Sequence, residues 1–174
     1  MTIYDWVSIV MLLLTIAVNS ASVYLQKTRR IYDKFGSRGY AVHTALISFV
    51  WGAFIITEFL ANRSTWRFSH AHPLPGLVIM AVALALFIAA LQQVGSNALS
   101  NGNFFGRPLR KLGGVYRYVR EPMYMSYAVW FLGLCLLTSM KVFLVYSAIT
   151  LVGLVGFESY IERPERANTQ PPQK

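Results

Sequence analysis

Charged residues are scarce in this chain. Asp, Glu, Lys and Arg together make up 13% of its 174 residues, whereas hydrophobic residues make up 55%. The mean hydropathy of +0.45 is far above that of a soluble domain of this length. This composition excludes a soluble globular domain and predicts an integral membrane protein.

The chain also lacks the residues of a disulfide-bonded or metal-binding fold. Its single cysteine, Cys135, can form no internal disulfide and is predicted to pack inside a span. His70 and His72, in "SHAHP", have no cysteine or carboxylate nearby, so we predict no metal site. His43, near the start of the second apolar run, is predicted to be a packed or interfacial residue. No P-loop, Gly-x-Ser-x-Gly or His-Glu-x-x-His motif occurs, which excludes a soluble nucleotide-binding domain.

Long apolar runs fill most of the chain. A helix crosses a membrane with about 20 mainly apolar residues, and five runs approach that length: 6–25, 40–61, 75–91, 123–139 and 142–157. The last two are predicted to form a helical hairpin, with Gly153 and Gly156 allowing close helix approach. We therefore predict an all-α membrane protein of five transmembrane helices, with one domain over residues 1–163 and a disordered polar tail over 164–174.

Basic residues set the expected orientation. The first 26 residues contain no Lys or Arg, so the first run lacks the positive end of a cleavable signal peptide and is expected to stay in the mature protein. Thirteen of the sixteen basic residues fall on one side of the predicted spans, which the positive-inside rule makes cytoplasmic. The N-terminus then faces out and the C-terminus is cytoplasmic, in a bacterial inner membrane or an endomembrane. The net charge of +9 predicts contact with anionic lipid headgroups and no nucleic acid.

Polar and aromatic residues gather in "GGVYRYVREPMYMSY", residues 113–127, directly before the fourth apolar run. Arg117 and Arg120 can each bind a carboxylate or phosphate through two hydrogen bonds. Glu158 and Glu162, four residues apart, would present two carboxylates from the end of the last helix. Together these groups predict a pocket for a ligand that bears both signs of charge. Three tyrosines offer it ring faces for an adenine or a cation: Tyr116, Tyr118 and Tyr124.

A simpler interpretation of the same residues stays open. Tyrosines and arginines at the mouth of a span also form the interfacial belt and basic anchor of an ordinary membrane helix. The two glutamates can pair with Arg163 and Arg166. Glu58, near the outer end of the second run and close to Arg63, is interpreted as an interfacial carboxylate that reaches water.

The segment "GVYRYVREPMY", Gly114 to Tyr124, resembles the Gly-Pro-Tyr-Arg-Tyr-Val-Arg-His-Pro-Met-Tyr signature of a family of integral-membrane methyltransferases. That family includes isoprenylcysteine carboxyl methyltransferase and the phospholipid N-methyltransferases. The upstream "NGNFFG" is similar to a segment of the phospholipid branch, and the resemblance extends over residues 76–163. It implies that S-adenosylmethionine is held between a cytoplasmic lid and the inner ends of the last spans. The implied acceptor is a membrane lipid, and a lipid amine such as phosphatidylethanolamine is favoured over an isoprenylcysteine carboxylate.

The resemblance also assigns roles to single residues. It implies catalytic roles for Arg120, Glu121 and Glu158, although Glu121 replaces the family's histidine and Ser159 stands where a second consecutive glutamate is expected. These departures leave open a non-catalytic relative that serves as a membrane scaffold or lipid-binding subunit. A sterol-reductase-like enzyme that uses NADPH is a further alternative. The residues implied in cofactor binding are Tyr116, Arg117, Tyr118, Arg120, Tyr124, Glu158 and Glu162.

Overall fold

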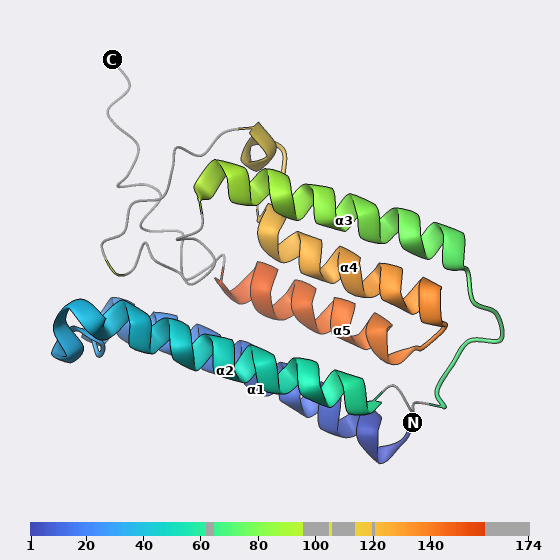
Figure 1. Cartoon of the computed structure of the whole chain (residues 1–174), viewed down its shortest axis with the longest axis horizontal. Coiled ribbons are helices and arrows are strands. Elements are labelled where there is room, and N and C mark those ends of the chain that lie inside the picture. Colours follow the sequence, from blue (N-terminus) through green and yellow to red (C-terminus); the bar gives the residue numbers. More distant parts are fainter. Residues whose placement is uncertain (62–64, 96–104, 106–113, 120, 159–174) are drawn as a thin grey trace.

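The computed structural model describes residues 1–61, 65–95, 105, 114–119 and 121–158. Its long helices lie where the apolar runs predict them (Figure 1): α1 Ile3–Arg29, α2 Gly39–Ala61, α3 Pro73–Val94, α4 Pro122–Thr138 and α5 Val142–Thr150. A π-helix, Leu151–Glu158, continues α5, and two short 3₁₀ helices, η1 Asp33–Arg38 and η4 Gly114–Arg117, complete the described elements. The predicted all-α fold is confirmed for this part of the chain.

The lengths of the helices decide how much of the predicted topology follows. Three segments are long and apolar enough to cross a membrane: Ile3–Arg29, Asp33–Glu58 and Pro73–Val94. The fourth helix has 17 residues, and the apolar stretch of the fifth runs from Val142 to Leu154. These two are shorter than an ordinary span, so five complete crossings remain a prediction, as does the orientation in the membrane.

Local sequence signals explain where the helices begin and end. Thr2 and Asp5 form a capping box on α1, in which the Thr2 amide donates to Asp5 Oδ2 at 2.5 Å and the Asp5 amide donates to Thr2 Oγ1 at 3.4 Å. Pro73 and Pro122 occupy the first turns of α3 and α4, where the missing amide hydrogen costs nothing. Gly95, with φ of 82°, ends α3 in a conformation that L-residues rarely adopt.

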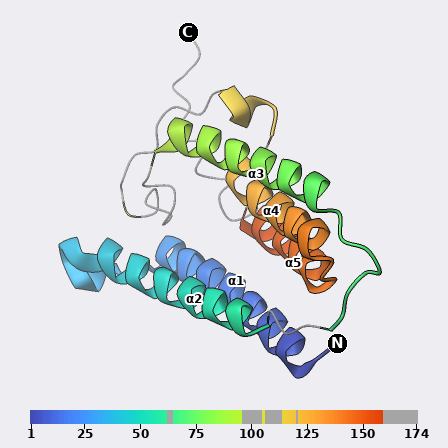
Figure 2. The same cartoon turned by 45° about the vertical axis from the view of Figure 1, so that its right-hand side comes forward.

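The helices form two layers, an α1–α2 pair and an α3–α4–α5 group (Figure 2). Within the second layer, α3 and α4 approach closely at Gly76 and Gly133: a Cβ atom at Gly76 would lie 2.7 Å from the Leu137 amide nitrogen. Between the layers, a Cβ atom at Gly153 would lie 2.9 Å from Ile16 Cγ2, which confirms close helix approach at this glycine.

Aromatic rings join the two layers in the core. Tyr146 of α5 is fully buried, and three phenylalanines surround its ring with centroids 5.5 to 5.7 Å away: Phe54, Phe131 and Phe143. Such edge-to-face pairs stabilise a core beyond the area that they bury. Cys135 is also buried, as predicted.

A polar network lies beside this aromatic core. The Tyr146 hydroxyl contacts Ser8 Oγ of α1 and lies 2.5 Å from Glu58 Oε1 of α2. The Ser8 hydroxyl donates in turn to the Asp5 carbonyl oxygen at 3.0 Å. Glu58 is half-buried, and its carboxyl group has a partner 88 residues away in the chain, a contact that its interpretation as an interfacial carboxylate did not include.

Candidate functional site

The alternating direction of the helices brings the signature residues to one end of the bundle, on the left in Figure 1. At this end, which we call the signature end, α1 and α3 finish and α2 and α4 begin. Because α4 and α5 are antiparallel neighbours, with the Ser147 hydroxyl donating to the Ala128 carbonyl oxygen at 2.8 Å, the π-helix that follows α5 also runs towards this end. The start of the fourth helix and the end of the last thus lie on the same side, as predicted.

The η4 turn that opens the signature packs against the end of α3. Val115 and Tyr116 contact a buried apolar cluster formed by Ala90, Val94 and Met123. The turn is closed by the Val115 carbonyl oxygen, which accepts hydrogen bonds from the amides of residues 118 and 119 at 3.1 and 2.9 Å. Val115 and Tyr116 thereby hold the η4 turn against the end of α3.

Gln93 lies in the last turn of α3, next to the signature turn. Gly114 has φ of 51°, and a Cβ atom at this glycine would lie 2.3 Å from Gln93 Nε2. Gln93 Oε1 is buried and has no hydrogen-bond partner among the described residues. Since buried carbonyl oxygens are normally paired, this oxygen is an acceptor available to a ligand.

Glu121, the residue that replaces the family's histidine, is buried with 4% of its surface exposed. It immediately precedes α4, and its carbonyl oxygen accepts from the Met125 amide at 2.8 Å. Its side chain does not cap the helix but has other interactions. Negative charge at a helix N-terminus is stabilised by the helix dipole, so a carboxylate is compatible with this position.

The remaining predicted site residues separate into three groups. Tyr116 and Tyr124 are half-buried and pack on the apolar clusters of the bundle. Arg117 is exposed, and Tyr118 is 83% exposed, so neither lies in the same buried environment as Glu121. Arg120 and Glu162 lie outside the described residues, and only the backbone of Glu158 is described.

A second cluster of polar and aromatic residues lies at the signature end of α1 and α2. His43 is completely buried, as its interpretation as a packed residue predicts, and its Nδ1 lies 2.9 Å from Ser22 Oγ. Ser22 Oγ also lies 2.6 Å from the Tyr32 hydroxyl. Phe105, from the "NGNFFG" segment, packs against this cluster with its ring tilted on that of His43, centroids 4.9 Å apart, and edge-on to that of Tyr40, centroids 5.5 Å apart. The N-terminal helix pair therefore holds one residue of the segment that precedes the signature.

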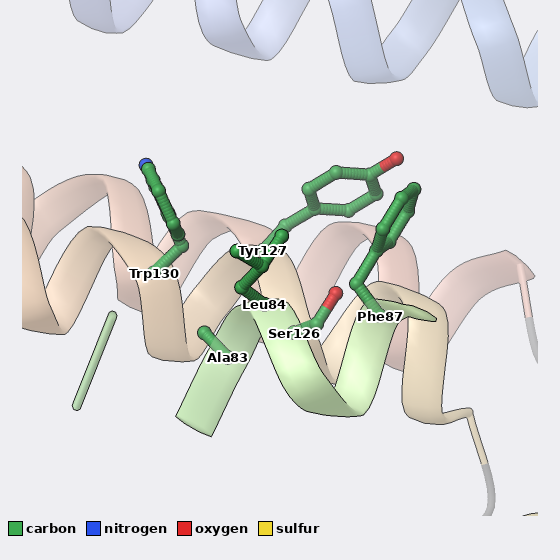
Figure 3. A pocket seen from close by; sticks show the side chains of 6 residues that line it. All are labelled: Ala83, Leu84, Phe87, Ser126, Tyr127 and Trp130. Carbon is green, nitrogen blue, oxygen red and sulfur yellow. The ribbon is translucent and has the colours of Figure 1, made fainter. Parts of the chain in front are cut away.

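An apolar cavity of about 200 Å³ lies between α3 and α4 (Figure 3). The Tyr127 ring in its wall contacts Trp51 of α2 with centroids 5.9 Å apart, so the cavity lies beside the gap between the two layers. Within the described ranges, no three His, Cys, Asp or Glu residues lie close enough to hold a metal ion. The cavity is lined by Ala83, Leu84, Phe87, Ser126, Tyr127 and Trp130.

Comparison with known proteins gives one match. A family model described as phospholipid methyltransferase matches residues 72–168, which is more than half of the 174-residue chain. The matched region begins at α3 and includes the signature, α4, α5 and the acidic residues beyond it. No curated protein and no solved structure matches the chain.

Proposed function

Because the chain belongs to the phospholipid methyltransferase family, we propose that it transfers a methyl group from S-adenosylmethionine to the amine of a membrane lipid such as phosphatidylethanolamine. The observation that carries this proposal is the position of buried Glu121 at the start of a membrane helix, beside a signature turn fixed to α3. A reaction between a water-soluble donor and a lipid-borne acceptor requires a polar site at this boundary.

The residues at the signature end fit the proposed cofactor. The unpaired Gln93 Oε1 is an acceptor for an ammonium or ribose hydroxyl group. Gly114 carries no Cβ atom and so leaves room for the Gln93 amide beside the turn, and the half-buried Tyr116 offers a ring face for an adenine. Arg120, as the resemblance implies, would hold the cofactor's carboxylate.

When bound, S-adenosylmethionine supplies a methyl group activated by the positive sulfur. The lipid nitrogen would accept this methyl group, the departing sulfur would keep the electron pair of the broken carbon–sulfur bond, and the nitrogen would have to lose a proton. Glu121 is the carboxylate at this end of α4 that can accept the proton. The packed helix ends orient the acceptor and exclude water, an effect that can lower the barrier by about 7 to 11 kcal/mol.

The first test is methyl transfer by the purified protein in phosphatidylethanolamine vesicles with methyl-labelled S-adenosylmethionine. We expect labelled lipid from the natural protein. Glu121→Gln should bind the cofactor in calorimetry but lose most of its turnover, because an amide cannot accept the proton. Absence of both cofactor binding and labelled product, with phosphatidylethanolamine and with an isoprenylcysteine substrate, would overturn the proposal.

One observation favours a second candidate, a non-catalytic relative that binds lipid. Glu121 stands where the family's signature has a histidine, and its burial prevents it from being an incidental surface change. The Glu121→His variant separates the two candidates. Turnover that appears only in Glu121→His would show that the natural chain has lost catalysis, whereas turnover in the natural protein excludes this candidate.

A further inference from the structure

We propose that the cavity between α3 and α4 binds one acyl chain of a membrane phospholipid, with the headgroup directed towards the signature end. This inference rests on the proposed function for the identity of the lipid as the acceptor. The cavity itself is defined by side chains of two neighbouring helices, as Figure 3 shows.

The chemistry of the lining suits hydrocarbon. Ala83, Leu84 and Phe87 contribute only apolar atoms from α3, and Tyr127 and Trp130 contribute ring surface from α4. The Ser126 hydroxyl donates to the Met123 carbonyl oxygen at 2.6 Å, so its proton is already used within its own helix. A cavity with few polar partners does not hold ordered water, and an apolar chain is the favoured occupant.

The depth of the cavity points to a lipid rather than a soluble ligand. Ala83 and Leu84 lie halfway along α3, which has 22 residues and is therefore about 33 Å long. Leu84 is 49% exposed, and Ile88, one turn further along the same face of α3, is 45% exposed. Because α3 is long and apolar enough to span the bilayer, this exposed surface faces acyl chains. The cavity thus lies at the depth of the part of the membrane that contains only hydrocarbon.

The cavity and the candidate site share a neighbouring residue, Phe87. Phe87 lines the cavity and also packs against the apolar cluster that carries Val115 and Tyr116 of the signature. From Phe87 to the end of α3 at Val94 the helix rises only about 10 Å. An acyl chain that lies along α3 would therefore bring its glycerol and headgroup to the signature turn.

The size of the cavity identifies the occupant as a single chain. A volume of about 200 Å³ has room for several methylene groups but not for a helix, so a protein partner does not fit. The α1–α2 layer lies beside it, with Trp51 in contact with Tyr127. A narrow apolar space between helices, at the depth of the hydrocarbon, is suited to one extended acyl chain.

The test fills the cavity without disturbing the helix interface. Leu84→Trp enlarges a half-exposed residue that lines the cavity, and Val82→Trp makes the same change two residues away on the lipid-facing side, where Val82 is 58% exposed. Each protein is placed in vesicles that contain phosphatidylethanolamine with a photoreactive diazirine in one acyl chain. After illumination, crosslinked peptides are identified by mass spectrometry.

In the natural protein and Val82→Trp, we expect crosslinks concentrated at residues 83–87 and 126–130. In Leu84→Trp, these crosslinks should fall and the KM for phosphatidylethanolamine should rise about tenfold, which is typical of a changed apolar pocket. Calorimetric binding of S-adenosylmethionine should be equal in all three proteins. Crosslinks spread evenly over the lipid-facing surface, or unchanged in Leu84→Trp, would overturn the proposal.

The same experiment separates this inference from the proposed function. Crosslinks within the cavity without any methyl transfer would support the acyl-binding site and refute the proposed methyltransferase activity. Equal rates of methyl transfer by Leu84→Trp and Val82→Trp would support the enzyme activity but refute the cavity as the acceptor's binding site. An unfolding measurement on both variants ensures that neither outcome reflects loss of the fold.

Discussion

Gly114 and Gln93 form the contact on which the candidate site most depends. Gly114 has a positive φ, and its lack of a side chain lets the Gln93 amide lie against the backbone of the signature turn. Gln93 Oε1 is buried and has no hydrogen-bond partner among the described residues. The absence of a side chain at Gly114 thus leaves room for the Gln93 amide beside the signature turn.

We expect Gly114→Ala to weaken S-adenosylmethionine binding without an unusual loss of stability. A left-handed backbone conformation costs an alanine about 1 to 2 kcal/mol, but the atom that a new Cβ would meet is the mobile end of Gln93, which moves away at little cost. Gly36→Ala is the control for binding, because Gly36 also has a positive φ, 55°, and has open space around it. Its ψ of −132° lies outside the left-handed helical region, so this control should lose at least as much stability as Gly114→Ala while S-adenosylmethionine binding falls at position 114 alone. Equal binding by both variants would contradict the role of Gln93.

At the scale of the helices, the α3–α4 contact is the tightest in the second layer. It depends on two glycines, Gly76 and Gly133, whose backbones lie against the opposite helix. Membrane helices associate through such close approach because lipid provides no hydrophobic drive for helix pairing. The cavity and the signature turn are both built on this pair of helices, so their geometry depends on it.

Gly76→Ala should destabilise the protein by about 1 to 3 kcal/mol, the usual cost of overpacking a core. The new Cβ would lie 2.7 Å from the Leu137 nitrogen and 2.8 Å from the Gly133 oxygen, and these backbone atoms cannot rotate away. Gly52→Ala in α2 is the control, since no atom lies within 4 Å of its Cβ position. Alanine favours the helix over glycine by about 1 kcal/mol, so the control should be neutral or stabilised. Thermal unfolding in detergent compares the two, and equal losses would argue against the close contact.

For the whole molecule, the positions of the helices could be predicted because apolar runs of span length have few alternative structures. The signature was also visible, since its arginines, tyrosines and Glu-Pro step are adjacent in the chain. Contacts between distant residues were not accessible: Gln93 with Gly114, His43 with Ser22, and Glu58 with Tyr146. The spacing of residues along the chain does not predict such pairs. They are brought together by the rotation of each helix about its own axis and by the angle at which two helices cross. The outward position of Tyr118 likewise follows from the turn of η4, which the residue pattern does not specify.

The orientation of the whole molecule can be tested with single cysteines. Cys135 is buried and should not react with a membrane-impermeant maleimide. Ser69, between α2 and α3, and Ser37, in η1, are exposed and lie at opposite ends of the bundle. With the N-terminus outside, Ser69→Cys should be labelled in intact cells, whereas Ser37→Cys should be labelled only after the membrane is opened. The reverse pattern would refute the orientation given by the basic residues.

The Tyr146 network has a consequence for the charge of the membrane-embedded protein. Three contacts join Glu58, Tyr146, Ser8 and the Asp5 carbonyl, but the two hydroxyl groups supply only two hydrogens. All three contacts can be hydrogen bonds only when Glu58 carries the third hydrogen. Glu58 should therefore react with dicyclohexylcarbodiimide, which attacks neutral carboxylic acids, and Glu58→Gln should remain as stable as the natural protein. An unreactive Glu58 would mean that one contact is not a hydrogen bond. A reactive Glu58 is neutral, which makes the folded chain one unit more positive than the formal +9 of its sequence.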